Sequence, residues 1–495
     1  MQLRYNSTRN NSQMYSSSEC ILKGLADDGG LFVTQNIDDI KFDVEKFIPM
    51  SYGEIAKVIL TQFLADFSEE QINYVVDKAY NTDNFETDEI FTMKDFDGYS
   101  YLELYRGRTI AFKDAALSIL PHLMKCAKDN VGEKRKIAIL TATSGDTGKA
   151  ALEGFRDADG IEVIVFYPFE GVSRLQLLQM LTQEGKNVNS LALRGNFDDA
   201  QTGVKEIFAD KEFNELLDKE GIVLSSANSI NIGRLIPQVV YYYYSYAQLV
   251  KKGKIKLGDK VNFVVPTGNF GNILAGYYAY KTGLYVNKFI CSSNENNVLY
   301  DFFTNYNYNK NREFKKTISP SMDILISSNL ERLVYEMCSR RDDKVISLMK
   351  ELSETGIYDI PKNDIFDMFV GGYATEDEIR ESIKRSYDED GYLIDTHTAT
   401  AHKVYKEYVK NSGDNSHCVL LSTASAYKFS KDVLLSLEPI KEELTDDVEY
   451  MYKLREKTSI DLPKVVDGIE NRSRKEEVVL SKDEMKNKII SILKR

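Results

Sequence analysis

The chain has 495 residues, too many for one ordinary domain, and its 43% apolar and 28% charged residues exclude a disordered or collagen-like chain. The net charge of -13, without any long basic block, argues against nucleic-acid binding. Five scattered cysteines, no apolar run at the start and no apolar stretch of about 20 residues predict a cytoplasmic protein without signal peptide or membrane span.

The first part of the chain predicts a small domain of mixed character. Residues 1–95 combine short turns with helical patterns such as Tyr52 to Phe67. Residues 97–127 then predict a strand over YSYLELYR, a loop, and a helix that begins at about Lys113. We therefore expect an N-terminal α+β segment that leads into a larger domain.

From Arg135 onwards, apolar strands alternate with helical patterns. The strands are predicted over KIAILTAT (136–143), IEVIVFYP (161–168), NSLALRG (189–195), KVNFVVP (260–266) and HCVLLSTA (417–424). Strands of this kind, separated by helices, indicate parallel sheets that are covered on both faces. The sequence therefore predicts an α/β fold with two open, twisted, mainly parallel sheets flanked by helices.

The same patterns suggest how the chain divides into domains. Residues 296–390 are charged and helical in pattern, which predicts a helical insertion. A capping-box signature, Ser481-x-x-Glu484, predicts a helix near the end of the chain. The expected parts are an N-terminal domain (1–95), a large domain (96–130 and 237–440), a small α/β domain (131–236) and a C-terminal helical tail (441–495).

Ligands of open α/β sheets bind beyond the carboxyl ends of the strands, so we expect ligand-binding residues in the loops that follow the predicted strands. The first such loop ends at Lys113, between Phe112 and a run of alanine and leucine. Burial there would lower the pKa of the amine and free it as a nucleophile toward an aldehyde. The alternative, a surface lysine beside Asp114 at the start of a helix, is the commoner case for a lone Lys-Asp pair.

Two further loops join a buried strand to a helix and suit an anion. Residues 141–149 (TATSGDTGK) bring hydroxyl groups to a helix N-terminus, but they lack the spacing of a Walker A loop. Residues 266–272 (PTGNFGN) carry two glycines that let successive N–H groups turn toward one phosphate. Their spacing is not GxGxxG, which argues against a dinucleotide. A plain turn remains the alternative reading of both loops.

Two weaker signals lie elsewhere. The strand end Ser422-Thr423-Ala424 offers a hydroxyl that could reach a ring nitrogen of a ligand. Ser229, Asn231 and Arg234 offer hydroxyl, amide and guanidinium donors at short spacing, and the arginine could bind a phosphate through two hydrogen bonds. Taken singly, a strand end and a helix cap also explain these segments.

Two other conspicuous groups are expected to be structural. Tyr241 to Tyr244 predict a helix that lies in the core, since no basic residues are interleaved with them. His397 and His402 are five residues apart, which does not suit a metal pair on one helix face, so we expect no metal site. What remains is a reactive amine, a phosphate loop, an anion loop and a hydroxyl for a ring nitrogen, which are the parts that pyridoxal phosphate needs.

These parts occur in a familiar order: AFKD, TATSGDTG, SSANSINIGRL, VPTGNFGN and SPSMDILISSNLERL. From about residue 3 to about residue 435, the chain resembles the threonine synthase family, of the longer microbial type, among the tryptophan-synthase-β-like enzymes. The resemblance implies pyridoxal 5'-phosphate bound between the two sheets. It implies conversion of O-phospho-L-homoserine and water to L-threonine and phosphate. We expect a monomer or homodimer that binds no nucleic acid, membrane or metal.

The resemblance also implies a role for each candidate residue. Lys113 would hold the cofactor covalently and act as the acid-base group. The other cofactor contacts would be Asp146 near the 3-hydroxyl, Thr423 at the pyridine nitrogen, and Gly268, Asn269, Phe270, Gly271 and Asn272 around the phosphate. The substrate contacts would be Ser144 and Thr147, with Ser229, Asn231 and Arg234 at the substrate phosphate.

Two alternatives stay open at this point. The first is an elimination enzyme with the same cofactor and an unphosphorylated substrate, which would not need Arg234 and Ser229. The second is a non-catalytic homologue that binds a phosphorylated ligand. The chain departs from the family pattern after Ala424, where Ser-Ala-Tyr replaces the usual His-Pro-Ala. This departure removes no group that the chemistry requires.

Overall fold

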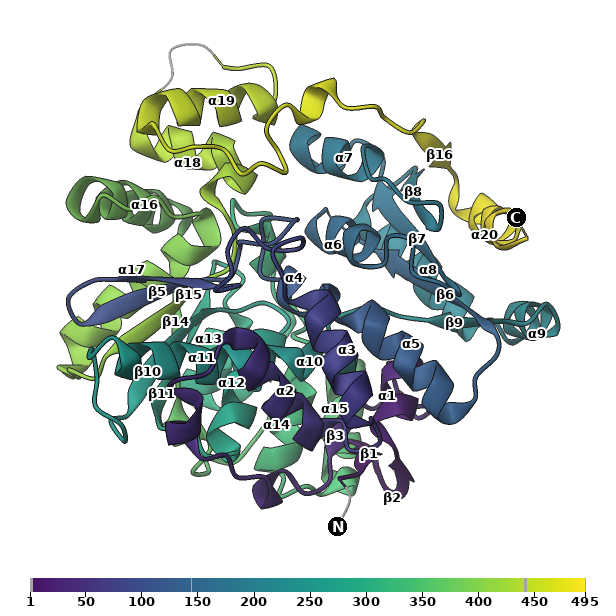
Figure 1. Ribbon diagram of the computed structural model, residues 1–495, viewed down its shortest axis with the longest axis horizontal. Coiled ribbons are helices and arrows are strands. Elements are labelled where there is room, and N and C mark those ends of the chain that lie inside the picture. The colour runs from purple at the N-terminus through teal and green to yellow at the C-terminus, as the bar shows by residue number, and fades with distance from the viewer. Residues whose placement is uncertain (1–2, 144, 440–442, 495) are drawn as a thin grey trace.

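The computed structural model describes residues 3–143, 145–439 and 443–494, and it confirms the predicted α/β class. A larger and a smaller sheet, both mainly parallel, lie beside one another, each flanked by helices (Figure 1). The N-terminal segment, purple in Figure 1, packs beneath them. Its strands and helices are β1 (Tyr5–Ser7), β2 (Asn10–Tyr15), β3 (Phe32–Thr34), α1 (Ser17–Lys23), α2 (Tyr52–Phe63) and α3 (Glu69–Ala79).

The larger sheet is parallel except for one edge strand, β4, which runs antiparallel to β5. All residues of β10 and β15 are buried, which explains their continuous apolar sequences. Alternate residues of β10 face opposite sides of the sheet: Val264 packs with α17, while Phe263 and Val265 pack with α11 and α12. The strand order is β14 (Phe369–Tyr373), β11 (Val286–Ser293), β10 (Val261–Pro266), β15 (Cys418–Ser422), β5 (Tyr99–Glu103) and β4 (Thr92–Asp95).

The smaller sheet is parallel throughout. One face packs against α5 and α6, and the other packs against α8, α9 and α20, so its strands are also covered on both sides. The strand order is β16 (Val478–Leu480), β8 (Val188–Leu193), β7 (Ile161–Pro168), β6 (Lys136–Ala142) and β9 (Ile222–Ser225).

Many of the remaining helices cover the two sheets, and others, such as α14 and α15, pack outside them. Among the described residues, none of the helices is both long and apolar enough to cross a membrane. Their bounds are α4 (Asp114–Leu117), α5 (Leu120–Val131), α6 (Asp146–Gly154), α7 (Arg174–Leu181), α8 (Phe197–Ala209), α9 (Lys211–Lys219), α10 (Ile232–Leu235), α11 (Pro237–Lys251), α12 (Gly271–Lys281), α13 (Val298–Asn305), α14 (Leu330–Met337), α15 (Asp342–Glu354), α16 (Glu376–Asp390), α17 (Thr396–Ser412), α18 (Ser430–Leu437), α19 (Asp447–Thr458) and α20 (Met485–Leu493).

The sequence predicts a helical insertion over residues 296–390, but this segment also contains strands. It includes a small antiparallel sheet of β12 (Asn307–Asn309) and β13 (Ile357–Asp359), and β14, which extends the larger sheet beside β11. The sequence of β14, FVGGY, hides a strand because glycine weakens strand patterns. Its glycines are needed for packing: a Cβ at Gly372 would lie 2.4 Å from Val404, and one at Gly371 would lie 3.0 Å from the backbone of Tyr300.

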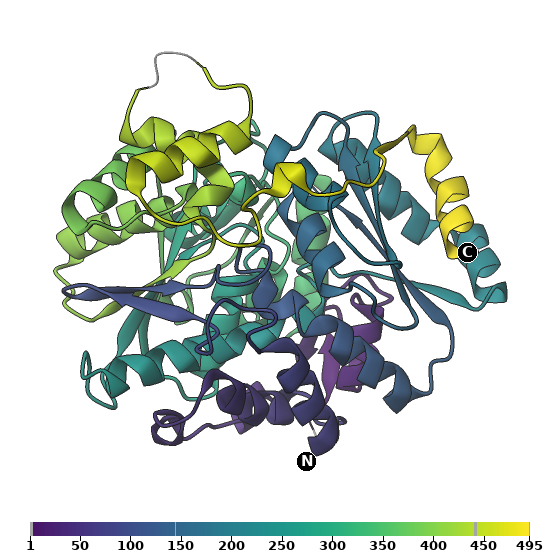
Figure 2. The ribbon, with the colours of Figure 1, turned by 45° about the horizontal axis from the view of Figure 1, so that its top comes forward.

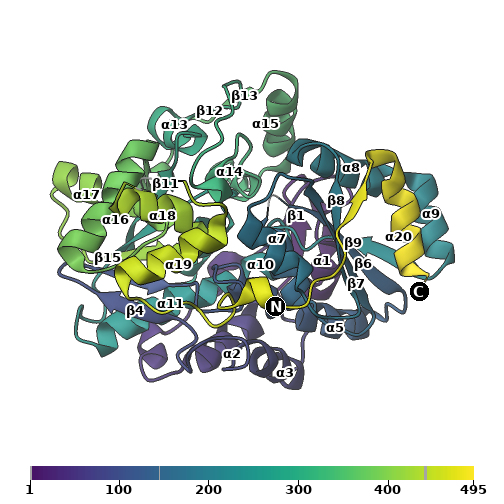
Figure 3. The ribbon, with the colours of Figure 1, turned by 90° about the horizontal axis from the view of Figure 1, so that it is seen from above.

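The C-terminal tail is also not purely helical. The chain leaves α19 beside the larger sheet, crosses to the other side of the molecule and adds β16 to the edge of the smaller sheet (Figures 2 and 3). The predicted capping box of Ser481 and Glu484 is present, and α20 follows it as expected. The tail therefore connects the two sheets through a strand pairing that local sequence did not reveal.

Candidate active site

Lys113 immediately precedes α4. Only 8% of its surface is exposed, so the alternative of a surface lysine is wrong. The loop before it is folded over the carboxylate of Asp114, which accepts hydrogen bonds from the Thr109 backbone N–H (2.8 Å) and hydroxyl (2.7 Å). Gly107 makes this fold possible, because a Cβ there would lie 2.3 Å from the Asp114 carboxylate. The loop therefore turns the lysine inward.

Burial lowers the pKa of Lys113 to about 8. The carboxylate of Asp146 opposes this change, while the positive charges of Lys428 and Arg234 reinforce it. A substantial part of the amine is therefore neutral near pH 8, which is the form that attacks an aldehyde.

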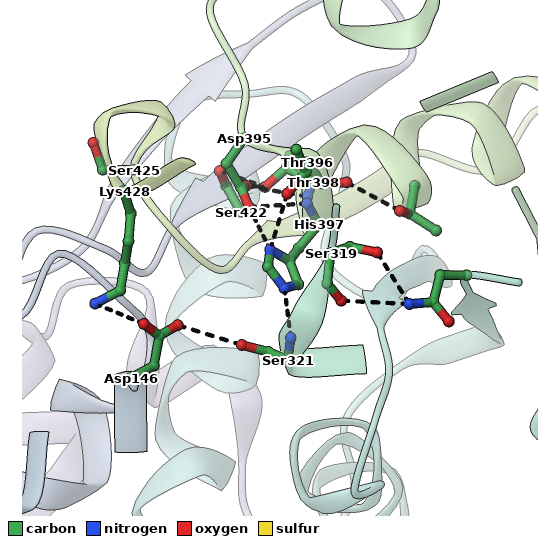
Figure 4. A network of polar contacts seen from close by, with 12 residues as sticks. Asp146, Ser319, Ser321, Asp395, Thr396, His397, Thr398, Ser422, Ser425 and Lys428 are labelled. Atoms are coloured by element: carbon green, nitrogen blue, oxygen red, sulfur yellow. Dashed lines mark hydrogen bonds and ion pairs between the residues drawn. The ribbon is translucent and has the colours of Figure 1, made fainter. Parts of the chain in front are cut away.

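Asp146 begins α6 and contacts residues of several separate segments, including Lys428 and Ser321 (Figure 4). Its Oδ1 accepts a hydrogen bond from Gln176 Nε2 (3.0 Å) and lies 3.2 Å from Lys428 Nζ. Its Oδ2 accepts a hydrogen bond from the Ser321 hydroxyl (3.3 Å) and lies 3.9 Å from Lys113 Nζ. Burial would raise the pKa of Asp146, but Lys428 and then Lys113 hold it well below its ordinary value. The carboxylate is therefore charged at neutral pH.

His397 extends this network to α17, a helix that packs against the larger sheet (Figure 4). Its Nε2 accepts the Ser321 backbone N–H (3.1 Å), and its Nδ1 lies 2.8 Å from Asp395 Oδ2. Because the Ser321 N–H can only donate, the ring proton must lie on Nδ1, where it is directed at Asp395. Asp395 in turn caps α17 through the N–H groups of His397 and Thr398. The network thus fixes the Ser321 segment against Asp146.

The loop after β10 has the shape expected of a phosphate site. Phe270 has a φ of 64°, a rare conformation for an aromatic residue, and it places the loop at the N-terminus of α12. The carbonyl oxygens of Gly268 and Asn269 point outward, to the Ser327 hydroxyl (2.6 Å) and to the Asn329 amide nitrogens (3.1 and 2.9 Å). The first N–H groups of α12 have no partner within the helix and are left for an anion.

Asn272 lies in the same turn and is held by tyrosine hydroxyls. Its Oδ1 accepts hydrogen bonds from Tyr241 (2.6 Å) and Tyr242 (2.9 Å). Its Nδ2 is buried and has no partner in the described part of the chain. The tyrosine run is buried in α11, as expected, and two of its hydroxyls aim this amide. An unsatisfied buried donor of this kind points to a ligand that completes the site.

Arg234 is 3% exposed and carries a charge without a counter-ion. Its Nη1 donates to the carbonyl of Ala227 (2.7 Å), and its Nε has no partner among the described residues. Burial alone lowers the pKa of Arg234 to about 10, and no described carboxylate lies within ion-pair distance of it. Buried charges are normally paired, so this guanidinium is suited to an anionic ligand.

The other predicted residues are placed in different ways. Thr423 follows β15, and its carbonyl accepts the Phe112 N–H (2.8 Å), so it lies next to the Lys113 loop. Thr147 lies in the first turn of α6, beside Asp146, and Ser229 is half-buried in the loop before α10. Ser144 lies outside the described residues.

Asn231 differs from the expectation that it contacts the substrate. Its Oδ1 caps α10 by accepting the Gly233 N–H (2.8 Å), and its Nδ2 donates to the carbonyls of Ile21 (2.9 Å) and Ser226 (3.1 Å). Because its side chain is fully engaged by the protein, it holds the Arg234 loop in place.

Sequence reasoning missed several residues of the site. Lys428, Gln176 and Ser321 contact Asp146, and His397 with Asp395 supports Ser321. In the sequence, the five-residue spacing of His397 and His402 predicts only that the two do not bind a metal as a pair. Nowhere in the described ranges do three or more His, Cys, Asp or Glu side chains gather so as to hold a metal ion. His402 is a core residue, and its ring lies among Tyr99, Tyr101 and Tyr405.

Comparison with known proteins finds matches for the N-terminal segment and for the α/β region that follows it. Residues 4–80 match the threonine synthase N terminus, and residues 99–424 match the pyridoxal-phosphate dependent enzyme family. Threonine synthase from Schizosaccharomyces pombe is 36% identical, over 88% of this chain and 90% of its own length. The chain belongs to the threonine synthase family. The crystal structure of PLP-bound threonine synthase from Brucella melitensis superposes with a TM-score of 0.87, at 33% identity and 99% coverage of both chains.

Another relative is longer than this chain. Threonine synthase-like 1 from Homo sapiens is 35% identical over 93% of this chain. The matched region spans 63% of the length of that relative.

Pyridoxal phosphate is the cofactor of this threonine synthase family member, and the described residues fit it. The turn at 268–272 supplies the buried Asn272 donor and the helix N-terminus that a phosphate needs. The turn is also narrow: a Cβ at Gly268 would lie 2.6 Å from the Ser321 carbonyl oxygen. The amine of Lys113 is buried and partly neutral, which suits it to the aldehyde of the cofactor.

Proposed function

We propose that the chain is a threonine synthase, a carbon-oxygen lyase that converts O-phospho-L-homoserine and water to L-threonine and phosphate. The observation that carries this proposal is Arg234, a buried guanidinium without a counter-ion among the described residues. Its positive charge helps to lower the pKa of Lys113, so the two groups belong to one site. A phosphate on the substrate would supply the missing anion. An enzyme for an unphosphorylated amino acid would have no use for this cation and would still bear the cost of burying it.

Each residue then has a task in the reaction. Pyridoxal phosphate, when bound, withdraws electrons from the amino-acid carbons next to the amine. Lys113 holds the cofactor, removes the proton from Cα and later returns a proton to it. Arg234, with Ser229, binds the phosphate that leaves from Cγ and stabilises its developing charge. A proton is also lost from Cβ before the phosphate leaves, and Cγ then takes up a proton to become the methyl group of threonine. Water adds at Cβ, which gives the hydroxyl.

The remaining contacts orient the cofactor and the substrate. The backbone and side chains of Gly268, Asn269, Phe270, Gly271 and Asn272 would hold the cofactor phosphate. Thr423 would face the ring nitrogen with a neutral hydroxyl, and Asp146 would lie near the 3-hydroxyl. Ser144 and Thr147 would bind the carboxylate of the substrate.

The same geometry explains how the enzyme would select its substrate. Homoserine without the phosphate would leave Arg234 buried and unpaired, and an unpaired charged group costs more than about 3 kcal/mol. We therefore expect a preference for the phosphorylated substrate of at least about a hundredfold in kcat/KM.

A paired assay tests the proposal. Purified protein is incubated with O-phospho-L-homoserine, and phosphate and threonine are measured together. Equal amounts of the two products are expected. Phosphate with 2-oxobutyrate would identify an elimination enzyme with the same cofactor. Neither product, from protein that carries the absorbance of bound cofactor, would refute the substrate.

A variant of Lys113 tests the role of the amine. Lys113→Ala is expected to abolish turnover and to remove the yellow absorbance that reports a covalently held cofactor. The protein should still bind the cofactor weakly, because the phosphate turn is unchanged. A variant that keeps the wild-type absorbance would contradict the assignment of Lys113.

A further inference from the structure

A second buried lysine, Lys428, lies next to the site and has no role in the proposed function. It belongs to the short 3-10 helix Ala426–Phe429, five residues after Thr423, and its side chain is 0% exposed. Its Nζ donates to the carbonyl of Thr109 (2.8 Å). It also lies 3.2 Å from Asp146 Oδ1, a contact that Figure 4 shows. These two contacts fix the ammonium group between the Lys113 loop and α6.

The two lysines are not equivalent partners of Asp146. The contact to Lys428 is within the range of a hydrogen-bonded ion pair, while the 3.9 Å separation from Lys113 is too long for a hydrogen bond. The other oxygen contacts of Asp146 come from neutral groups, Gln176 Nε2 and the Ser321 hydroxyl. Lys428 is therefore the principal counter-ion of this carboxylate.

Among the described residues, no carboxylate other than that of Asp146 lies within ion-pair distance of Lys113, although Asp114 also raises its pKa slightly. Arg234 on α10 is a second cation. Asp114 on α4 is turned toward the N–H and hydroxyl of Thr109, and burial raises its pKa to about 6. The two ring nitrogens of His397 on α17 are engaged by the Ser321 N–H and by Asp395. A protonated Lys113 would be a buried cation next to two others, with a carboxylate that is already paired.

We propose that Lys428 is a positioning residue that holds Asp146 as its own counter-ion and so leaves Lys113 as a neutral, reactive amine. The inference rests on the proposed role of Lys113 and extends it. In the reaction that Lys113 undergoes, its nitrogen forms a double bond to the aldehyde carbon of the cofactor. The two amine protons and the carbonyl oxygen leave together as water, so the amine must begin in its neutral form.

Removal of the Lys428 charge tests this role. In Lys428→Met, Asp146 loses its principal counter-ion and becomes the counter-ion of Lys113. The pH at which Lys113 becomes reactive should rise by about 1 unit or more, since an opposite charge at this distance favours the protonated form. Near pH 7.5, the cofactor should then be taken up roughly tenfold more slowly.

Two readouts on the full-length chain, freed of cofactor, measure the effect. The first is trace acetylation of Lys113 by acetic anhydride between pH 6 and pH 10, quantified by mass spectrometry, which needs neither cofactor nor turnover. The second is the rate of absorbance change after pyridoxal phosphate is added, over the same range of pH. The midpoints of both pH profiles should shift together.

Matched variants separate charge from packing. Lys428→Arg keeps the charge, and its midpoint should stay near that of the wild type. Lys149→Met removes another buried lysine, which pairs with Glu153 (2.9 Å) and Gln183 rather than with Asp146, and it should also leave the midpoint in place. Lys428→Gln, neutral and more polar, replaces the methionine variant if that chain fails to fold by circular dichroism.

The outcomes are distinct. A raised midpoint in the neutral variants, with Lys428→Arg and Lys149→Met unchanged, supports the proposal. An unchanged midpoint in a folded neutral variant overturns it, as does an equal rise in Lys149→Met. Failure of the wild-type protein to take up cofactor would instead contradict the proposed function, while the acetylation profile would still decide the role of Lys428.

Discussion

Replacement of Arg234 by methionine is expected to make the protein more stable and much less active. Burial lowers the pKa of Arg234 to about 10. Its charge is therefore opposed by the fold at every pH below that value, where the guanidinium is protonated in both the folded and the unfolded chain. At about 1.4 kcal/mol for each pKa unit, this opposition amounts to roughly 3 kcal/mol at neutral pH.

The methionine side chain removes this cost but also loses a contact. The Ala227 carbonyl would no longer receive the Nη1 hydrogen bond, which is worth about 1 kcal/mol. The net expectation is a rise of about 2 kcal/mol in the free energy of unfolding of Arg234→Met. In the same variant, loss of two charge-assisted hydrogen bonds to the substrate phosphate, at about 1.5–3 kcal/mol each, should lower kcat/KM about a hundred- to ten-thousand-fold.

Urea denaturation followed by circular dichroism measures the stability, because the chain has no tryptophan for fluorescence. Arg332→Met is the matched control. Arg332 is also fully buried, but it donates to the carbonyls of Phe32 (2.8 Å) and Ile230 (2.6 Å) and to Asn329 Oδ1. Its loss leaves these acceptors unpaired and should destabilise the protein. If Arg234→Met proves less stable than the wild type, the reasoning about its unpaired charge is refuted.

Two further predictions concern the phosphate turn and a core histidine. Gly268→Ala should weaken cofactor binding at least about tenfold in a spectroscopic titration, because the added Cβ would lie 2.6 Å from the Ser321 carbonyl oxygen. Gly53→Ala is the control and should bind the cofactor normally, because its Cβ would lie 3.7 Å from the nearest atom. Equal affinities of the two variants would contradict the narrow turn. Burial lowers the pKa of His402 to about 3, so the unfolded chain binds a proton that the folded chain does not as the pH falls below about 6.5. Between pH 8 and pH 5, the free energy of unfolding of the wild type should therefore fall by about 2 kcal/mol more than that of His402→Phe. Urea denaturation of both proteins at the two pH values measures this difference.

The central strands and the loops that follow them could be predicted from the sequence, because burial on both faces makes each strand a continuous apolar run. The runs at 136–143 and 161–168 coincide with β6 and β7 to within a residue. The edge strands β14 and β16 could not be predicted in this way. Their sequences carry little local signal, and their pairing depends on neighbours that are far away in the chain.

The candidate site divides along the same line. Lys113 and the turn at 268–272 can be recognised in the sequence because the residues that characterise each of them are adjacent in the chain. Lys428 and Ser321 are single polar residues, and their roles arise only when separate segments meet at Asp146. No periodicity or spacing within the chain records that meeting.

Asn231 and Arg234 show why a motif does not by itself assign roles. Both are polar residues of one short segment, and both were expected to contact the substrate phosphate. The side-chain amide of Asn231 forms its hydrogen bonds within the protein, whereas the Nε of Arg234 is buried and has no partner in the described part of the chain. The distinction is one of satisfaction: a group whose hydrogen bonds are complete stabilises the fold, and a buried group whose bonds are incomplete costs stability until a ligand arrives. Because Arg234 also influences Lys113 and Asn272 also lies in the glycine turn, we propose that they mark two separate places for phosphate, one for the substrate and one for the cofactor.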